Sequence, residues 1–470
     1  MKRLLLTLLS MGLTAFTVHA ETLTLVGGTA INPADGKIIQ NAVITISGDT
    51  IESVGSGDKA PAGAKTIDCK GKFILPGYID SHVHFFQSAD LFTRPDVVDL
   101  TNVRSYSDEV AWVKSHVEDV FARYLRCGIT SVVDVGGPMW NFEVRKHAGE
   151  TAKAPRVAVA GPLISSVSRP QLDLGDPPIV RIDTPDQARE FVRKLAPQRP
   201  DFVKIWYIVD KDHPVGSFRP IVRATIEESH NNKLRVAVHA TELETARAAV
   251  EEGADVLVHS VTDKEVDDGF VQLLKAKHTI LCPTLVVFER YGRTFANKLN
   301  LTPEENAWGN PEVIATLDVT KLDPSKVPER IKAALADPAA MLSRIEATYK
   351  VALKNLKTLE DAGITIAAGT DAGNIGTIHG PALFREFQLM KEAGLTPMQI
   401  LKDATSNGAQ LFGGDIGSKL GSLEAGKFAD LVILKSNPVT EITQASEIDA
   451  VVKGGVAYPV DTILRAPMPR

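Results

Sequence analysis

Two histidines that lie two residues apart are the first chemical signal in this sequence. His82 and His84 belong to the segment 77–86, which follows a short apolar run at 73–76. Side chains at positions i and i+2 of a β-strand point to the same face, so a strand here would place both imidazoles on one side. Imidazole suits zinc, iron, nickel or copper better than calcium or magnesium. The pair indicates a metal site if the chain supplies matching ligands, and surface histidines on an edge strand if it does not.

Other ionisable residues lie at or near the ends of strand-like runs. If Ala237 and His239 face inward, Val236 and Val238 face outward, and the same alternation turns His259 inward. An unpaired lysine or aspartate facing inward would be costly, so convergence on metal ions explains these positions together. The residues concerned are Lys204, His239, His259 and Asp371.

The strand-like runs alternate with helix-like stretches, which predicts an α/β fold of the (β/α)8 TIM-barrel type. The eight runs are residues 73–75 leading to His84, 129–135, 156–160, 201–208, 234–239, 254–259, 279–285 and 364–368. Ligands and catalytic residues of such a barrel gather at the carboxyl ends of its strands. The barrel domain is expected over 73–414, with a helical insertion at about 286–361 that is too long for one returning helix.

The two ends of the chain are rich in short strands and turns. Residues 21–72 and 415–470 each contain alternating apolar runs separated by turn residues, and neither piece is large enough to bury a core alone. We expect the two pieces to pair into one small β-sandwich beside the barrel.

Composition excludes several classes of protein. The chain has 470 residues, of which 44% are hydrophobic and 23% charged, as in an ordinary globular enzyme. Its formal net charge is -6, and no basic run resembles a nucleic-acid binding surface. The three cysteines, Cys69, Cys127 and Cys282, are far apart and indicate neither a disulfide framework nor a zinc knuckle.

The first twenty residues have the pattern of a signal peptide. Lys2 and Arg3 precede an apolar stretch that continues to Val18, and a small-residue cleavage site follows at Ala20. The apolar stretch is shorter than a typical membrane-spanning helix, and no cysteine follows it to carry a lipid anchor. We expect a secreted or periplasmic protein with no stable membrane insertion after cleavage; an uncleaved N-terminal anchor is the alternative.

Taken together, these motifs resemble the amidohydrolase superfamily of metal-dependent hydrolases. The resemblance rests on residues 75–84, Lys204, His239, His259, the Gly-Thr-Asp-Ala-Gly motif at 369–373 and the tail at 420–433. It covers nearly the whole chain after residue 20. Within the superfamily, the chain resembles the imidazolonepropionase-related and Xaa-Pro-dipeptidase-like branch.

The resemblance implies a centre of two divalent metal ions, with zinc the first choice and a single ion, iron or manganese the alternatives. His82 and His84 would bind the inner ion, His239 and His259 the outer ion, and Asp371 would contact the inner one. Lys204 would bridge the two after carboxylation by carbon dioxide, because an unmodified ammonium has only donors. The alternative is that Lys204 forms a structural ion pair at the barrel mouth, which would leave a single metal ion.

This ligand set predicts hydrolysis of an amide or peptide bond in a small substrate, such as a dipeptide or an N-acyl amino acid. A divalent ion lowers the pKa of bound water from about 16 toward 7. Asp371 would act as the general base and pass the proton to the departing amine. His379 and Tyr207 are weaker candidates for substrate contacts, since a helix-entry histidine and a rim tyrosine explain them as well. The sequence leaves a homo-oligomer open.

Three other functions use the same residues. A deaminase would employ Glu242 as a proton shuttle, although Glu242 also fits the start of a helix, where a carboxylate favours the dipole. A lactonase or an organophosphate-type esterase would use nearly the same metals. A non-catalytic metal-binding protein would keep the ligands without turnover, yet the general-base candidate Asp371 is present.

Overall fold

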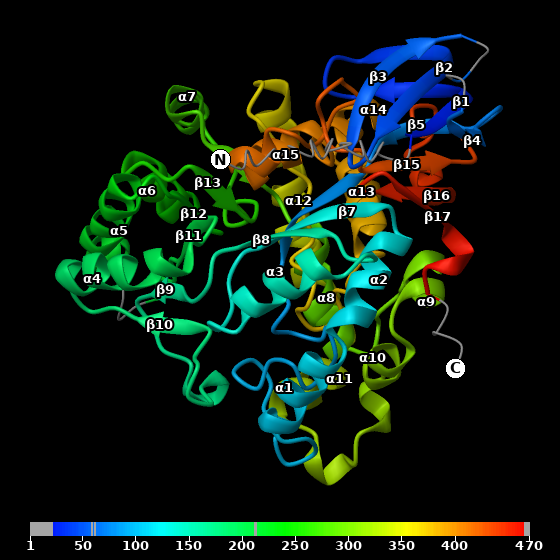
Figure 1. Ribbon diagram of the computed structural model, residues 1–470. Coiled ribbons are helices and arrows are strands. Elements are labelled where there is room, and N and C mark those ends of the chain that lie inside the picture. The colour runs from blue at the N-terminus through cyan, green and yellow to red at the C-terminus, as the bar shows by residue number, and fades with distance from the viewer. Residues whose placement is uncertain (1–21, 58–59, 61–62, 211–213, 465–470) are drawn as a thin grey trace, which may run out of the picture.

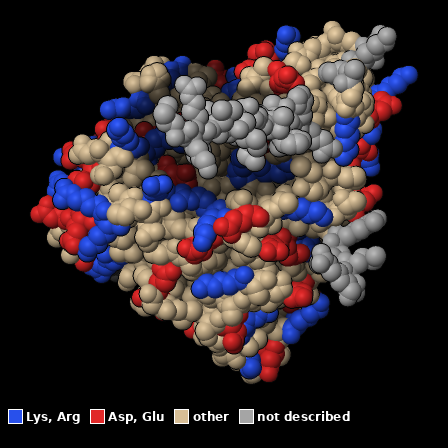
Figure 2. All heavy atoms as spheres, viewed as in Figure 1, with Lys and Arg blue, Asp and Glu red and all other residues tan. Residues whose placement is uncertain are grey.

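The computed structural model describes residues 22–464, except 58–59, 61–62 and 211–213 (Figure 1). The expected signal peptide at 1–20 lies outside the described residues. Among the helices of the described part, none has both the length and the apolar character that a membrane span requires. On the face shown in Figure 2, Lys and Arg side chains are interspersed with Asp and Glu rather than gathered in one patch.

Both ends of the chain contribute to one eight-stranded sheet, with the order β17-β16-β15-β5-β1-β2-β3 and β4 paired to β1. Figure 1 shows the blue strands of the N-terminal part beside the red strands of the C-terminal part. The junction is the antiparallel pair β5–β15, in which Leu75 lies opposite Val432. The strands are β1 (Thr22–Asn32), β2 (Lys37–Ser47), β3 (Thr50–Ser56), β4 (Lys65–Asp68), β5 (Phe73–Pro76), β15 (Leu431–Leu434), β16 (Ile448–Lys453) and β17 (Val456–Pro459). The two ends therefore pair as expected, while the two-layer sandwich stays a prediction.

The central part of the chain contains parallel strands in two groups. One sheet has the order β6-β7-β8 and the other β10-β9-β11-β12-β13-β14. Most of their residues are buried, as expected for parallel strands covered on both faces. The strands are β6 (Tyr78–Val83), β7 (Ile129–Asp134), β8 (Arg156–Val159), β9 (Leu163–Ser165), β10 (Ile179–Arg181), β11 (Phe202–Trp206), β12 (Arg235–His239), β13 (Val256–Val258) and β14 (Ile280–Cys282).

Backbone hydrogen bonds link the two parallel sheets. They run from Asp201 N to Val159 O, from Leu281 N to Thr365 O and from Ser81 N to Ala368 O, at 2.9–3.0 Å. The segment 364–368, expected as the eighth strand, therefore lies between β14 and β6. It makes only an isolated bridge, Leu281 to Ile366, rather than a full strand.

Helices return the chain between successive parallel strands, and in Figure 1 α4, α5 and α6 lie outside β11 and β12. These helices are α1 (Tyr106–Ser115), α2 (Val117–Arg126), α3 (Asn141–Glu150), α4 (Pro185–Leu195), α5 (Val215–Asn231), α6 (Leu243–Glu251) and α7 (Asp268–Lys277). After residue 380 follow α13 (Ala382–Glu392), α14 (Pro397–Asp403), α15 (Ser406–Phe412) and α16 (Gly414–Gly417).

The segment expected as a helical insertion is helical through most of its length. It contains α8 (Leu285–Phe295), α9 (Pro303–Trp308), α10 (Pro311–Thr316), α11 (Glu329–Ala336) and α12 (Pro338–Asp361). Its own apolar cluster includes Phe295, Val313 and Ile331, which pack with Leu91 and Ile375 from outside the insertion. The insertion is thus anchored to the loops that follow β6 and the segment 364–368.

Glu386 on α13 fixes the start of α8. Its carboxylate oxygens accept hydrogen bonds from Leu285 N at 2.9 Å and Val286 N at 2.7 Å. These are free amides of a first helical turn, and a carboxylate there complements the helix dipole. Burial nevertheless dominates and raises the pKa of Glu386 from 4.5 to about 8.

We expect Glu386→Gln to change how stability depends on pH. The unfolded chain releases this proton near pH 4.5 and the folded chain holds it to about pH 8, so wild-type stability falls as pH rises through that interval. Glutamine does not titrate. The difference between the urea midpoints of wild type and variant should therefore decrease from about pH 5 to pH 8 and then stay constant. Glu392→Gln on the same helix is the control, and identical pH profiles for wild type and Glu386→Gln would contradict the expectation.

Candidate metal centre

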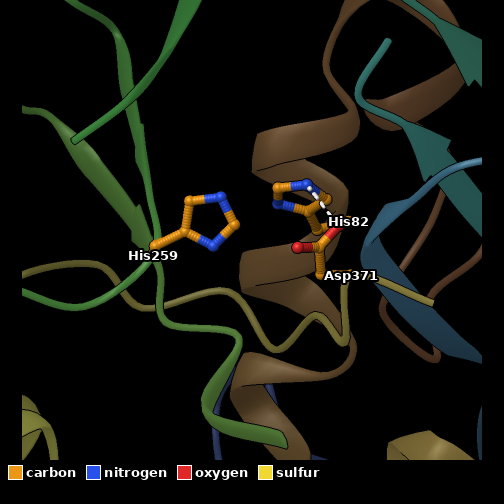
Figure 3. A group of neighbouring side chains, drawn as sticks. All are labelled: His82, His259 and Asp371. Atoms are coloured by element: carbon orange, nitrogen blue, oxygen red, sulfur yellow. Dashed lines mark ion pairs between the residues drawn. The ribbon is translucent and has the colours of Figure 1, made fainter. Parts of the chain in front are cut away.

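The side chains of His82, His84 and Asp371 meet at one point. His82 Nε2 lies 3.4 Å from His84 Nε2, and Asp371 Oδ1 lies 3.3 Å from the first nitrogen and 3.1 Å from the second. All three residues are buried. Figure 3 shows Asp371 and His82 turned toward each other, with His259 facing them from a neighbouring segment.

This arrangement follows from the way β6 meets the segment 364–368. Asp371 N donates to His82 O at 2.7 Å, and His84 N donates to Ala372 O at 2.8 Å. β6 and the chain around residue 369 approach this closely because residue 369 is a glycine. A Cβ at Gly369 would lie only 2.8 Å from His82 N and 2.5 Å from Cys282 Sγ.

His259 and His239 complete the cluster from the adjacent strands. The ring of His259 lies 4.9 Å from that of His82 and 4.4 Å from that of His239, between centroids. His239 ends β12, and His259 follows β13 with φ at 78°, a left-handed conformation that a non-glycine residue adopts at a cost. Ligand atoms of His82, His259 and Asp371 all lie within 4.8 Å of one another, the spacing of groups that can hold one ion.

The protonation states suit metal binding, which requires neutral imidazoles and an ionised carboxylate. Burial lowers the pKa of His82 to about 4 and that of His239 to about 3, and it moves the pKa of His259 well below its ordinary value. Burial alone would raise the pKa of Asp371, but His82 and His84 hold it well below its usual range. His84 Nδ1 donates to Gly136 O at 2.6 Å, which leaves its Nε2 lone pair facing the cluster.

These donors fit a metal ion on the structure's own evidence. Two imidazole nitrogens at 3.4 Å, each beside the same carboxylate oxygen, repel one another unless a proton or a cation lies between the groups, and a divalent ion would satisfy all three at once. His82 Nδ1 is buried and has no hydrogen-bond partner among the described residues, so hydrogen bonding does not fix the tautomer of His82. The role of these side chains as metal ligands stays a prediction.

Lys204 lies beside the histidines with its charge uncompensated. It is on β11, only 2% exposed, and burial lowers the pKa of its amine to about 7. Among the described residues, no carboxylate oxygen lies within 4.0 Å of the Lys204 amine, the limit for an ion pair. The alternative of an ion pair at the barrel mouth is therefore not supported.

A cavity of about 380 Å³ opens over the cluster. All six expected ligands line it, together with mostly apolar side chains and one arginine from two directions. The β9–β11 side contributes Leu163, Leu172, Ile179 and Trp206, and the helical insertion contributes Val287, Phe288, Tyr291 and Arg330. The site thus combines a polar floor with apolar walls, the usual composition of a small-molecule site.

Neither of the two expected substrate contacts lines the cavity, and their role stays a prediction that the structure does not support. His379 does not line the cavity, because its ring nitrogens are engaged by Tyr124 OH at 2.7 Å and Gln87 O at 2.8 Å. Tyr207 also lies outside the cavity and donates to Val215 O at 2.6 Å. Both are packing residues whose polar atoms already have protein partners.

Glu242 is likewise absent from the cavity wall. It is exposed and precedes α6 as its N-cap residue. Its neighbour Thr241 lines the cavity instead. A proton shuttle must reach the reacting atoms, so this placement removes the residue on which the deaminase alternative depended.

The sequence did not reveal a polar network behind Asp371. Asn374 Nδ2 donates to Asp371 Oδ1 at 2.7 Å, and Asn374 Oδ1 accepts from Arg94 at 2.8 Å and from the hydroxyl of Tyr291. Asn374 lies three residues after Asp371, the one positional hint available. Arg94 and Tyr291 come from a loop and from the insertion, where no periodicity marks them.

The fold and this site are those of an α/β protein with a buried cluster of potential metal ligands at the floor of a cavity, and comparison with known proteins gives its family. The family model described as "Amidohydrolase family" matches residues 73–457. Ochratoxinase from Aspergillus niger is 26% identical over 94% of this chain and 88% of its own length. Imidazolonepropionase from Paenarthrobacter aurescens is 36% identical over 16% of this chain and 18% of its own length. A solved Xaa-Pro dipeptidase with bound methionine superposes with a TM-score of 0.69 at 23% identity, over 93% of this chain and 100% of the other.

The chain therefore belongs to the amidohydrolase family. It is a hydrolase that acts on carbon–nitrogen bonds, and the family is typically metal-dependent. The resemblance to this family inferred from the motifs is confirmed.

Gly369→Ala should disturb the floor of the site. The added methyl group would press on His82 N and Cys282 Sγ, and overpacking of this kind costs about 1–3 kcal/mol. We expect a lower urea midpoint and less metal bound after reconstitution, measured by elemental analysis. Gly149→Ala on α3 is the matched control, because its methyl group meets no atom within 4 Å. Wild-type stability and metal content in Gly369→Ala would show that the close approach is unnecessary.

Proposed function

We propose that this protein hydrolyses the amide or peptide bond of small substrates, such as dipeptides or N-acyl amino acids, at a centre of two divalent ions, zinc in the first instance. The observation that carries the proposal is the meeting of His82, His84 and Asp371 within 3.1–3.4 Å at the floor of a substrate-sized cavity. His239 and His259 would supply the remaining nitrogen ligands.

Carboxylated Lys204 would bridge the ions. An unpaired ammonium buried beside histidines is unfavourable, and a pKa of about 7 leaves much of the amine neutral at neutral pH. A neutral amine adds to carbon dioxide, forms a nitrogen–carbon bond and releases one proton, which gives a carbamate with a negative charge and two oxygen donors. The modification thus turns an uncompensated cation into the ligand type that the centre lacks.

Asp371 would carry the proton between water and the leaving group. The bound metal supplies Lewis acidity, which brings the pKa of water from about 16 toward 7. Asp371 is ionised, adjacent to both inner histidines and held by Asn374, so its carboxylate is fixed where it can accept the proton of the attacking water. It then returns that proton to the departing amine nitrogen.

The shape of the cavity and the relatives support a small amide substrate. A cavity of about 380 Å³ takes a molecule of dipeptide size rather than a protein loop. Xaa-Pro dipeptidase and ochratoxinase are among the proteins similar to this chain. A lactonase or organophosphate-type esterase would use a similar centre, and a substrate panel separates it from an amidase.

The proposal extends to the architecture and to export. We infer that eight parallel segments form a (β/α)8 barrel, namely β6–β8, β11–β14 and the segment 364–368, supported by the backbone bonds that link both sheets and this segment. We also propose cleavage near Ala20 and release to the periplasm or the medium, on the pattern of residues 1–20. Mass spectrometry of the protein recovered from an expressing bacterium tests the cleavage.

Metal analysis tests the role of Lys204. We expect about two ions per wild-type chain and one or none in Lys204→Ala, because the bridge holds both. Lys264→Ala, which changes an exposed lysine, should keep the wild-type count. An unchanged count in Lys204→Ala would remove this residue from the centre, whereas loss in both variants would point to general instability.

A panel of dipeptides, N-acyl amino acids, lactones and phosphotriesters tests the reaction. We expect amide hydrolysis that a chelator abolishes and that zinc or manganese restores. Asp371→Asn should lower kcat by about 100-fold or more, the range typical of a lost general base. Asp361→Asn, at the end of α12, should leave kcat unchanged. Turnover of lactones or phosphotriesters without amides would overturn the proposed reaction.

A further inference from the structure

Two arginines line the cavity, and they differ in whether their charge is balanced. Arg94 is held by Asp96, with contacts of 2.7 Å from Nε and 2.8 Å from the second terminal nitrogen. Its remaining terminal nitrogen donates to Tyr291 and Asn374. Arg94 is therefore engaged on all sides by the protein and serves to hold the network behind Asp371.

Arg330 is differently placed. It is the second residue of α11, exposed at the cavity wall, with its guanidinium 5.4 Å from the centroid of the Phe295 ring. One terminal nitrogen donates to Val97 O at 3.1 Å. No carboxylate among the described residues lies within ion-pair distance of it. The planar guanidinium of Arg330 therefore lines the cavity without a carboxylate partner among the described residues.

One face of α8 connects Arg330 to the histidine cluster. The ring of Phe288 lies 6.2 Å from that of His259, at the metal end. Tyr291, one turn further, contacts the ring of Phe295 at 6.2 Å, and Phe295 lies beneath Arg330. From Phe288 to Phe295 the helix covers roughly 10 Å. An apolar wall of that length therefore runs from the reacting end of the cavity to its cation.

We propose that Arg330 determines specificity by binding a free carboxylate of the substrate, at the end remote from the scissile bond. The guanidinium fork matches a carboxylate in two parallel hydrogen bonds. The substrate class is an amide whose carboxylate is separated from the scissile carbonyl by an apolar chain of about 10 Å, as in an N-acyl amino acid whose linear acyl chain ends in a carboxylate. The identity of the bond that breaks rests on the proposed amide hydrolysis. The binding of a carboxylate by Arg330 does not depend on it.

Binding of octanedioate and octanoate by the metal-loaded protein tests the site without turnover. Both probes have the same chain length, and only octanedioate has a second carboxylate to reach Arg330 from the histidine end. We expect titration calorimetry to show about tenfold tighter binding of octanedioate by wild type. Arg330→Gln should remove that preference, because a hydrogen-bonded charge pair is typically worth about this factor. Arg330→Lys should keep part of it.

Arg344→Gln is the matched control, since it removes an exposed arginine from α12 of the same insertion. It should bind both probes as wild type does. Equal binding of the two probes by wild type, or an unchanged preference in Arg330→Gln, would overturn the proposal. An effect of equal size in Arg344→Gln would assign the preference to the general charge of the insertion and also overturn it.

Kinetics then separate this inference from the proposed reaction. For N-(7-carboxyheptanoyl)-L-phenylalanine, whose acyl chain has the length of octanedioate, Arg330→Gln should raise KM about tenfold and leave kcat nearly unchanged; for N-octanoyl-L-phenylalanine, neither value should change. If no amide is hydrolysed but the octanedioate preference depends on Arg330, the proposed reaction fails and the anion site stands. If amides are hydrolysed with equal KM by wild type and Arg330→Gln, the reaction stands and the anion site fails.

Discussion

The close approach of β6 to the segment 364–368 is the constraint on which the site depends. Backbone hydrogen bonds join His82 O to Asp371 N and His84 N to Ala372 O, and Gly369 leaves room for them. Because these bonds are made by the main chain, the two histidines and the aspartate are set against one another by the strands that bear them. Asp371 has φ at 61°, so the chain turns sharply where its carboxylate meets the imidazoles.

Burial then determines the chemistry of these side chains. Burial lowers the pKa of His82, His239 and His259, while Asp371 stays ionised because His82 and His84 face it. The same effect makes the amine of Lys204 a weak base. A buried carboxylate behind the site, Asp80, accepts hydrogen bonds from Thr370 N and Thr370 Oγ1 and ties the two segments together a second time. The cluster is thus already close to the charge state that a divalent ion requires.

The floor and the wall of the cavity come from different parts of the chain. The strands supply the nitrogen and oxygen donors, whereas α8 and α11 of the insertion supply Phe288, Tyr291 and Arg330. Glu386 joins the two parts, since it reaches from α13 to the first amides of α8. This division allows the substrate-facing residues of a family to differ while the reacting centre is kept.

The sequence alone determined the elements and the ligand candidates, because both depend on local pattern. The i, i+2 spacing placed His82 and His84 on one face, strand parity turned His239 and His259 inward, and a glycine-rich motif marked Asp371. Tertiary structure decided what no local pattern contains. Arg94, Asn374 and Arg330 reach the cavity from loops and an insertion. His379 and Tyr207 do not line it, and their polar atoms bond to Tyr124, Gln87 and Val215. A hydrogen-bond partner that is distant in sequence has no periodic relation to the residue it engages, so only the folded chain reveals it.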